Sequence, residues 1–403
     1  MIALFLLILV DSISATVIVP LLGPLLIDKA TVVFLPDASL PLRNFVSGLL
    51  VAVYPLLMLY MAPVLGRLSD QWGRRPVLLL CCTGVLTANV ASGIAIETHS
   101  LALLFVGRLI GGATAAAQPT AQAALVDLGT NKGRLLSYSM LFSSLGYVLG
   151  PVVASGLSTI SFAAPLYFCS LLTLLALVLI LAGYREAEVP GRRVDWSGIS
   201  IWEGVRCFRD AVRDGAVRAI LGSFLLMQVA WGGFFVFVSI YLMESPSLDL
   251  NLHQVGSFMS IMGVGFCIAN ALVQPALARW FGMRTLSVAG LALNAGAIAL
   301  CLALDSPYQE YGAALVAGIT INIAYPSILT MLSDRVPPDR QGWILGMVGS
   351  AAAMGWTIAS VLSGMLGGLG PALPVMLAAA LMATAALAMT VAGRGWQKDG
   401  APD

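Results

Sequence analysis

Twelve apolar stretches, each about as long as a membrane-crossing helix, follow one another along most of this chain. An α-helix rises 1.5 Å per residue, so about 20 apolar residues cross the hydrocarbon core of a bilayer. Only 10% of the residues are charged and 59% are hydrophobic, whereas soluble domains carry about 25% charged residues. We therefore expect an all-α membrane protein of 12 transmembrane helices in a lipid bilayer.

Hydropathy divides the spans into two sets of six. The first set occupies residues 3–27, 45–65, 76–96, 101–125, 135–158 and 163–183. The second set occupies residues 219–243, 255–277, 285–304, 311–333, 343–366 and 373–393. The polar residues between them predict three parts: an N-terminal bundle over 1–183, a cytoplasmic linker over 184–218 with an interfacial helix near 200–214, and a C-terminal bundle over 219–403. The opening segment has no Lys or Arg before its apolar run, so we expect a retained helix rather than a cleaved signal peptide.

The basic residues predict the orientation. If the amino terminus is cytoplasmic, every Lys and Arg except Lys29, Arg43 and Arg108 lies in a cytoplasmic segment. Cytoplasmic loops of membrane proteins are enriched in basic residues. We therefore expect both termini in the cytoplasm of a bacterium, with the chain in the inner membrane.

The two sets of spans resemble each other, because several residues recur at a nearly fixed offset. Internal repeats of this kind are common in transporters. The pattern predicts two six-helix bundles related by pseudo-twofold symmetry. The matching pairs are Pro119 and Pro326, Asp127 and Asp334, Gly146 and Gly355, Gly150 and Ala359, and Ser155 and Gly364.

Asp11 and Arg108 stand out as charges within the predicted spans. Ionisable residues in a membrane interior are expensive and commonly functional. Asp11 lies about 15 Å from one end of its span and Arg108 about 12 Å from the other end of its own, so both fall near the midplane. Burial favours a neutral carboxyl and a nearby guanidinium favours an ionised one, so Asp11 could carry protons. The alternative is a permanent ion pair that joins two helices.

The turn between the second and third spans reads GRLSDQWGRRPVL over residues 66–78. Gly66 would allow close helix approach, and Gly73 would permit a tight turn. Asp70 would receive helix amides or pair with an arginine, and Arg74 and Arg75 would hold the cytoplasmic side. Alternatively, the turn only fixes the topology. The matching turn of the second half has Arg279 in place of an acid, so we expect any latch to be asymmetric.

This turn resembles the signature loop of the major facilitator superfamily, with Gln71 where an arginine is common. The resemblance implies that the loop latches the cytoplasmic side and that Asp127 is the acidic partner of its arginines. LFVGRLIGGATAA at 104–116 is similar to the family's helix 4 motif, in which an arginine, here Arg108, assists proton transfer.

A further motif, GYVLGPVVASG at 146–156, resembles the helix 5 motif of drug/proton antiporters, with Ala154-Ser155 replacing the usual Gly-Gly. Its defining residues are Gly146, Gly150 and Pro151. The alternative interpretation is that these residues only allow close packing between helices. The first half of the chain is most similar to the branch that contains tetracycline/proton antiporters and 12-helix multidrug exporters. Tetracycline exporters carry an acid in helix 9, where this chain offers only Asn294, so tetracycline is a doubtful substrate.

The family resemblance also implies a central cavity lined by helices 1, 4, 7 and 10. Neutral amides and aromatic rings would suit a mostly apolar ligand with a few polar groups. Each aromatic residue taken alone could equally face lipid or a neighbouring helix. The candidate lining residues are Gln118, Gln122, Gln228, Trp231, Phe234, Asn322 and Tyr325.

Other functional classes are disfavoured. The sequence has no GxxxxGK[ST] phosphate-binding loop, and its two histidines, His99 and His253, fall in predicted outer loops, so neither an ATP-driven pump, a metal site nor an enzyme is expected. A net charge of +1 gives no sign of a nucleic-acid partner. We expect a monomeric proton-coupled antiporter without a cofactor, which exports a small amphipathic, drug-like molecule with about one proton per substrate. Export of a siderophore or other metabolite, uptake by symport and a channel remain as alternatives.

Overall fold

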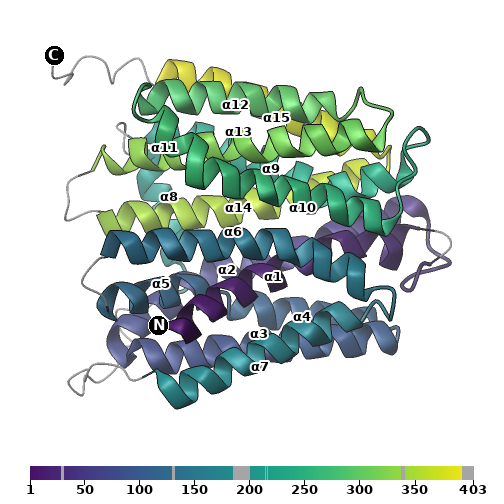
Figure 1. The fold of residues 1–403 in the computed structure, drawn as a ribbon, viewed down its shortest axis with the longest axis horizontal. Coiled ribbons are helices and arrows are strands. Elements are labelled where there is room, and N and C mark those ends of the chain that lie inside the picture. Colours follow the sequence, from purple (N-terminus) through teal and green to yellow (C-terminus); the bar gives the residue numbers. More distant parts are fainter. Residues whose placement is uncertain are drawn as a thin grey trace.

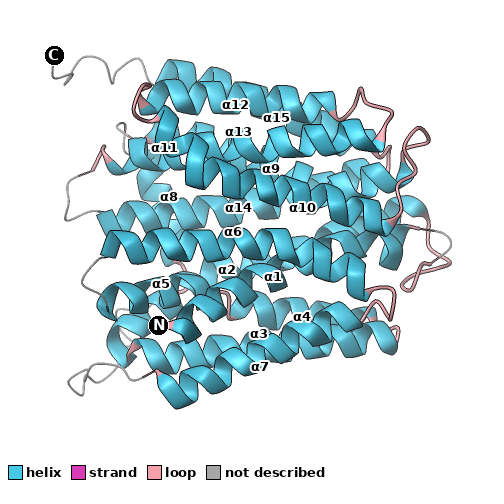
Figure 2. Ribbon diagram, viewed as in Figure 1, coloured by secondary structure: helices cyan, strands magenta, loops and turns pink. Residues whose placement is uncertain are grey.

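A computed structural model describes residues 1–28, 31–128, 132–184, 200–213, 215, 217–336 and 341–392. Within these ranges the chain is helical and contains no strand (Figure 2). The helices lie roughly parallel to one long direction (Figure 1). Twelve helical segments are long and apolar enough to span a membrane, which confirms the predicted all-α membrane fold.

The first half contains seven α-helices and a π-helical turn. They are α1 (Ile2–Leu22), η1 (Gly23–Ile27), α2 (Leu40–Trp72), α3 (Arg74–Glu97), α4 (Leu101–Ala113), α5 (Ala117–Leu128), α6 (Lys132–Leu157) and α7 (Ala164–Gly183). A short helix, α8 (Glu203–Arg213), lies in the predicted linker, where a helix was expected. The second half comprises α9 (Arg218–Glu244), α10 (Leu252–Ile268), η3 (Ala269–Val273), α11 (Gln274–Leu277), α12 (Met283–Leu300), α13 (Pro307–Ser333), α14 (Gln341–Gly367) and α15 (Ala372–Ala392).

Three of the predicted spans are not continuous α-helices. The first passes from α1 into the π-helical η1. The fourth is divided into α4 and α5. The hydroxyl of Thr114 donates to the carbonyl of Ile110 at 2.9 Å, a local bond of the type that bends helices. The eighth passes from α10 through the π-helical η3 into α11, and π-helical turns are frequent at functional sites.

The two halves occupy different sides of the molecule, and α2 packs against α14 while α6 packs against α10 across the boundary (Figure 1). The internal repeat is visible in matching hydrogen bonds. The guanidinium of Arg75 donates to the carbonyl of Leu181 at 2.8 Å, and that of Arg284 donates to the carbonyl of Thr390 at 2.8 Å. Donors and acceptors are related by the same sequence offset, so each bond joins the third helix of a half to its sixth.

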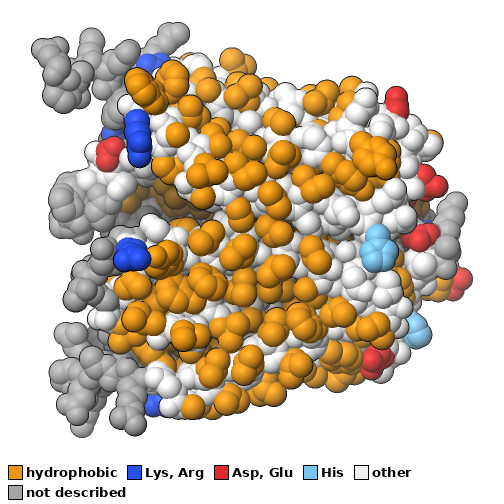
Figure 3. Space-filling model, viewed as in Figure 1, with side chains coloured by type: hydrophobic (Ala, Val, Ile, Leu, Met, Phe, Trp, Pro, Cys, Tyr) orange, Lys and Arg blue, Asp and Glu red, His pale blue; other side chains and the backbone are white. Residues whose placement is uncertain are grey.

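Charge is segregated between the two ends of the bundle. We call the end at which α1 begins the proximal end and the opposite one the distal end. In the view of Figure 3, Lys and Arg side chains gather at the proximal end, where an acidic side chain lies among them, the remaining Asp and Glu and the His side chains lie at the distal end, and hydrophobic side chains cover the surface between them. The predicted positions of Lys29, residues 185–199 of the linker and the carboxy-terminal residues 393–403 lie outside the described residues.

The halves are tightly packed towards the distal end. A Cβ built on Gly48 of α2 would lie 2.4 Å from the carbonyl oxygen of Ser360 and 2.9 Å from the Cα of Gly364 in α14. A Cβ on Gly256 of α10 would lie 2.4 Å from the hydroxyl of Ser155 in α6. We call these contacts of Gly48, Ser155, Gly256 and Gly364 the distal seam. Glycine permits this close approach of helices, as is common in membrane proteins.

At the proximal end, α8 lies between the two halves. A Cβ on Gly204 would approach the carbonyl of Leu59 in α2 to 2.4 Å and the hydroxyl of Ser350 in α14 to 2.9 Å. Glu203 of α8 also forms an ion pair with Arg67 at the foot of α2. The linker helix therefore contacts both halves at the end where their charged residues gather.

Candidate functional site

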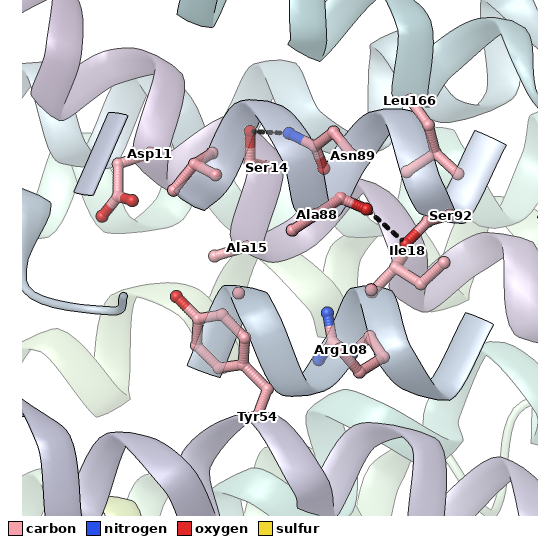
Figure 4. A pocket seen from close by; sticks show the side chains of 13 residues that line it. Asp11, Ser14, Ala15, Ile18, Tyr54, Ala88, Asn89, Ser92, Arg108 and Leu166 are labelled. Carbon is pink, nitrogen blue, oxygen red and sulfur yellow. Dashed lines mark hydrogen bonds between the residues drawn. The ribbon is translucent and has the colours of Figure 1, made fainter. Parts of the chain in front are cut away.

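A small pocket lies within the first half, between α1, α2, α3, α4 and α7 (Figure 4). The rest of its wall is formed by small and aliphatic residues, but six polar side chains reach it. These are Asp11, Ser14, Tyr54, Asn89, Ser92 and Arg108. Both charged residues selected from the sequence therefore line one pocket.

Glycines bring α4 close enough to place Arg108 in this pocket. A Cβ on Gly112 would lie 2.6 Å from the carbonyl oxygen of Tyr54 in α2, and one on Gly107 would lie 2.4 Å from the hydroxyl of Ser92 in α3. These contacts hold α4 against two neighbouring helices. As a result, Arg108 lies beside α2 rather than at the lipid surface.

The guanidinium of Arg108 is held by α2. Its Nε donates to the carbonyl of Leu50 at 3.0 Å, and its Cζ lies 4.9 Å from the centre of the Tyr54 ring, within the range of a cation–π interaction. The described residues contain no ion pair between Arg108 and Asp11. In this conformation the two residues share a pocket without the ion pair that one alternative interpretation requires.

Asp11 projects from α1 and is half-buried. Within the described part of the chain, neither its carboxylate nor the Tyr54 hydroxyl has a hydrogen-bond partner. In Figure 4 the Tyr54 hydroxyl rises towards the part of the pocket where Asp11 lies, while its ring lies beside Arg108. On another wall the amide of Asn89 donates to the hydroxyl of Ser14 at 3.2 Å.

A second, narrow apolar pocket adjoins the first and shares Ile18 and Arg108 with it. Its other lining residues, Leu22, Leu50, Val51 and Leu104, lie nearer the distal end. Arg108 thus stands between the Asp11 pocket and an apolar space on its distal side.

Sequence reasoning missed Tyr54, Ser14 and Asn89. Tyr54 is a polar aromatic residue within the apolar run VAVYPLL, which is a weak signal because tyrosine is common in membrane helices. Ser14 lies three residues after Asp11 and so shares its helix face. That spacing was a usable signal for Ser14.

The turn at residues 66–78 contains the ionic contacts that its motif implies. Arg74 Nε lies 3.0 Å from the carboxylate of Asp127 at the end of α5, and Arg74 also pairs with Asp70. Gly73 has a φ of 109°, a left-handed conformation that favours glycine. The expectation for Gly66 is wrong in this conformation, since a Cβ there would meet nothing within 4 Å.

The helix 5 motif packs α6 against α1. A Cβ on Gly146 would lie 2.4 Å from the Cβ of Ser12, and one on Gly150 would lie 1.9 Å from the hydroxyl of Thr16. The carbonyl of Pro151 faces α10, at 3.1 Å from a Cβ built on Gly256. The same helix thus contacts α1, which carries Asp11, and the distal seam.

Several predicted cavity residues are engaged in packing instead. Gln118 and Gln122 of α5 donate to the hydroxyls of Ser143 and Ser139 in α6, at 3.2 and 3.3 Å. Phe234 is fully buried, and its ring centre lies 5.7 Å from that of Trp231. Gln228 and Trp231 are also buried. In this conformation these three α9 residues do not line an open cavity, because their faces are covered by neighbouring helices.

Asn322 belongs to a polar group that spans the two halves. The amide of Asn270 in η3 donates to the side-chain oxygen of Asn322 at 3.2 Å and to the hydroxyl of Ser144 in α6 at 3.4 Å. Asn270 is exposed although it lies in the middle of a membrane-spanning segment. Sequence analysis missed it, because a single Asn in an apolar run does not reveal which way it faces.

Aromatic rings flank this group. Phe266 of α10 lies 6.0 Å from Tyr147 of α6 and 5.9 Å from Trp231 of α9, measured between ring centres. Tyr325 of α13 lies 5.8 Å from Phe224 of α9. The amide and hydroxyl group with its aromatic neighbours is therefore the second polar feature inside the membrane-spanning region.

Comparisons with known proteins agree with this architecture. The family model described as Major Facilitator Superfamily matches residues 4–304 and 245–394. The tetracycline resistance protein, class C, of Escherichia coli is 27% identical over 309 residues, covering 76% of each chain. Multidrug resistance protein 1 of Bacillus subtilis is 25% identical over 343 residues, covering 81% of this chain and 82% of its own.

Solved structures share the fold at lower identity. The human organic anion transporter MFSD10 (TETRAN) superposes with a TM-score of 0.70 at 20% identity, covering 96% of this chain and 98% of its own. A D-xylose-proton symporter superposes with a TM-score of 0.75 at 16% identity, covering 96% of each chain. With a family model that spans nearly the whole sequence, the chain belongs to the Major Facilitator Superfamily of membrane transporters.

Proposed function

We propose that this transporter is a proton-coupled antiporter that exports a small amphipathic molecule from the cytoplasm. The observation that carries the proposal is the carboxylate of Asp11, which faces a pocket in the membrane interior beside Arg108 and Tyr54 without pairing with either. A nearby cation favours the ionised form of a carboxylate. If the guanidinium moves towards or away from Asp11, the carboxylate can release or bind a proton. The names of the bacterial relatives support export.

The charge distribution supports an orientation with the proximal end in the cytoplasm and the distal end outside. In this orientation the apolar pocket beyond Arg108 lies on the outer side of Asp11. A proton from outside would pass Arg108 to reach Asp11. The guanidinium could then turn from the Leu50 carbonyl towards the ionised carboxylate, and the Tyr54 hydroxyl or a water would bridge the remaining gap.

Alternating access would follow from rocking of the two halves about the substrate. The distal seam is closed here, which corresponds to a state sealed on the outside. Opening of the seam would require α6 at Pro151 to slide against α10, while Gly146 and Gly150 keep α6 packed on α1. Since α1 carries Asp11, protonation and seam opening would be mechanically linked through this packing.

The signature turn would act as a latch at the cytoplasmic side. Arg74 joins the turn to the foot of α5 through Asp127, and α5 continues the helix that carries Arg108. Breaking this contact would therefore change the balance between the two states more than it changes ligand binding. The signature turn would therefore act on the transport cycle rather than on the binding of the ligand.

The substrate would bind between the halves, near Asn270, Asn322 and the adjoining aromatic rings. Amides and aromatics favour a largely apolar ligand that offers a few hydrogen-bonding groups. Asn294, at the position where tetracycline exporters carry an acid, is fully buried, and its amide donates to the carbonyl of Ala317 at 2.8 Å. This helix therefore lacks the acidic group that tetracycline exporters carry. We propose that the substrate is a different drug-like compound or a secreted metabolite.

The test is transport by the purified protein in liposomes with an imposed pH difference. The panel consists of lipophilic cations, neutral drugs and siderophores. Antiport predicts that a substrate moves against the proton gradient and that a protonophore stops the movement. Movement of substrate together with protons would identify an uptake symporter, and movement insensitive to the protonophore would refute proton coupling.

A further inference from the structure

Glu310 is a buried carboxylate that the mechanism above does not use. Its side chain is 0% exposed, and neither carboxylate oxygen receives an N–H or O–H hydrogen bond within the described part of the chain; only the weak donor of the Cys301 thiol lies within reach. The sequence analysis began the tenth span at residue 311, so Glu310 fell outside it. In the structure the helix α13 begins earlier, at Pro307, and draws Glu310 into the bundle at the distal end.

The groups around Glu310 do not compensate a negative charge. From the end of α12, the thiol of Cys301 faces it, but a thiol is a weak donor and this one donates to the Ala297 carbonyl at 3.4 Å. From α9, the Tyr241 hydroxyl donates to the Cys301 carbonyl at 3.2 Å. Two further acids lie at this end of the bundle: Asp305, exposed in the turn before α13, and Glu244, the last residue of α9.

The other elements that pack against α13 add no cation. In α10 the titratable residues are His253, exposed in its first turn, and Cys267, at its other end, while η3 and the described part of α14 carry none. On α13 itself Tyr308 and Tyr311 pack against each other at 6.3 Å between ring centres. No described Lys or Arg forms an ion pair with Glu310.

An ionised carboxylate in this position would be desolvated and unpaired, which is strongly unfavourable. The first turn of a helix favours negative charge, but only weakly compared with that desolvation. A neutral, protonated carboxyl removes the charge without changing the packing. The surroundings of Glu310 therefore select its protonated form in the closed-seam conformation.

The position of Glu310 also connects it to the distal seam. It lies about 6 Å along the helix from Ser306, the residue that precedes α13, so a small movement would expose it to the outer side. Its neighbour Tyr241 lies on α9 between two close contacts. A Cβ on Gly367 of α14 would lie 2.7 Å from the Phe237 ring, and one on Gly23 would lie 2.7 Å from Met243 Sδ. The contact between Gly23 and Met243 joins the two halves, so their separation at the distal end would free α9 to shift beside Glu310.

We propose that Glu310 is a second proton-binding site, located in the carboxy-terminal half. It holds a proton while the distal seam is closed and releases it to the outer compartment when the seam opens. This release step rests on the proposed alternating-access function, whereas the protonated state in the closed conformation does not. Because the closed state binds the proton more tightly, raising the pH shifts the equilibrium towards the open seam, by up to about tenfold per pH unit for one proton.

The protonated state is tested by infrared spectroscopy on the whole protein with isotope-labelled glutamate. We expect a protonated carboxyl band near neutral pH that carries the isotope shift and is absent from Glu310→Gln. This substitution replaces one neutral group by another of similar size, so it should fold. If the labelled wild type shows no protonated glutamate band, the proposal is overturned without recourse to any variant.

The release step is tested with spin labels at the exposed positions Leu42 and Leu369, which report the width of the seam. The measurement uses the Asp11→Asn background, so that the titration of Asp11 does not contribute. We expect the open population to rise with pH, to lose this dependence in Glu310→Gln and to keep it in the control Asp305→Asn. A pH dependence that survives Glu310→Gln would overturn the proposal. Failure of the antiport proposal would instead be seen in the liposome assay.

Discussion

Substitution of Gly48 by alanine should force the distal seam open. The added methyl would lie 2.4 Å from the Ser360 carbonyl oxygen and 2.9 Å from the Gly364 Cα. Both atoms belong to the backbone of α14, so no rotation of a side chain can relieve the contact. Ordinary contact distances are about 3.5 Å, so the two helices must separate by about 1 Å.

The energetic effect of this separation follows from known core substitutions. Overpacking of a well-packed interface costs about 1–3 kcal/mol. Since 1.4 kcal/mol is a factor of ten, the ratio of closed to open seam should fall by about 5- to 150-fold. The alanine itself is compatible with the helix, so the folded amount of protein should change little.

Pulsed electron resonance between spin labels at Leu42 and Leu369 measures this ratio. We expect Gly48→Ala to add a population with a longer distance between the labels. Gly156→Ala is the matched control, because Gly156 also lies near the distal end but a Cβ there would meet nothing within 4 Å. Identical distance distributions for the two variants would refute the assignment of Gly48 to a seam that must open.

Three further substitutions test separate parts of the site. Gly150→Ala places a methyl 1.9 Å from the Thr16 hydroxyl and should lower stability by about 1–3 kcal/mol; unchanged thermal unfolding in detergent would contradict the α1–α6 packing role. Tyr54→Phe keeps the ring beside the guanidinium of Arg108 and removes the hydroxyl. Proton-driven transport should therefore slow while the affinity for substrate stays constant. An unaltered transport rate would exclude the hydroxyl from the proton path. Arg74→Ala breaks its pair with Asp127, a partly exposed contact worth at most about 1 kcal/mol, and should slow turnover without loss of ligand binding, whereas a large loss of affinity would count against a latch.

The sequence predicted the number and placement of the spans because hydrophobic length is a local property of the chain. It could not place the break between α4 and α5. At that break Thr114 both donates to the Ile110 carbonyl and packs against Gly84 of α3, where a Cβ would come within 2.2 Å of the threonine hydroxyl. Packing between distant segments leaves no clear local pattern in a sequence that is apolar throughout.

The same distinction applies to the site. The resemblance of the turn at 66–78 to the family's signature loop implied the contact between Arg74 and Asp127, which the structure contains. The membership of Asp11 and Arg108 in one pocket followed from their depth. By contrast, Phe234 was expected in a cavity and is buried among helices, since a helical pattern does not show whether a face meets a neighbour or an open space.

Glu310 was missed for a related reason. A charged residue next to an apolar run is normally placed in the adjoining loop. The extension of α13 to Pro307 and its packing against α9 and α12 carried the carboxylate inside. The start of a helix is among the least certain features of a sequence-based prediction, and here four residues changed the environment of an acid.

The central claim is that proton uptake and release by Asp11 drive transport. The most direct measurement is substrate movement into liposomes under an imposed pH gradient by Asp11→Asn, compared with wild type and with Asp37→Asn, an exposed acid in a loop at the distal end. We predict that Asp11→Asn binds substrate and folds normally but loses gradient-driven transport, while Asp37→Asn retains it. Undiminished gradient-driven export by Asp11→Asn would contradict the account.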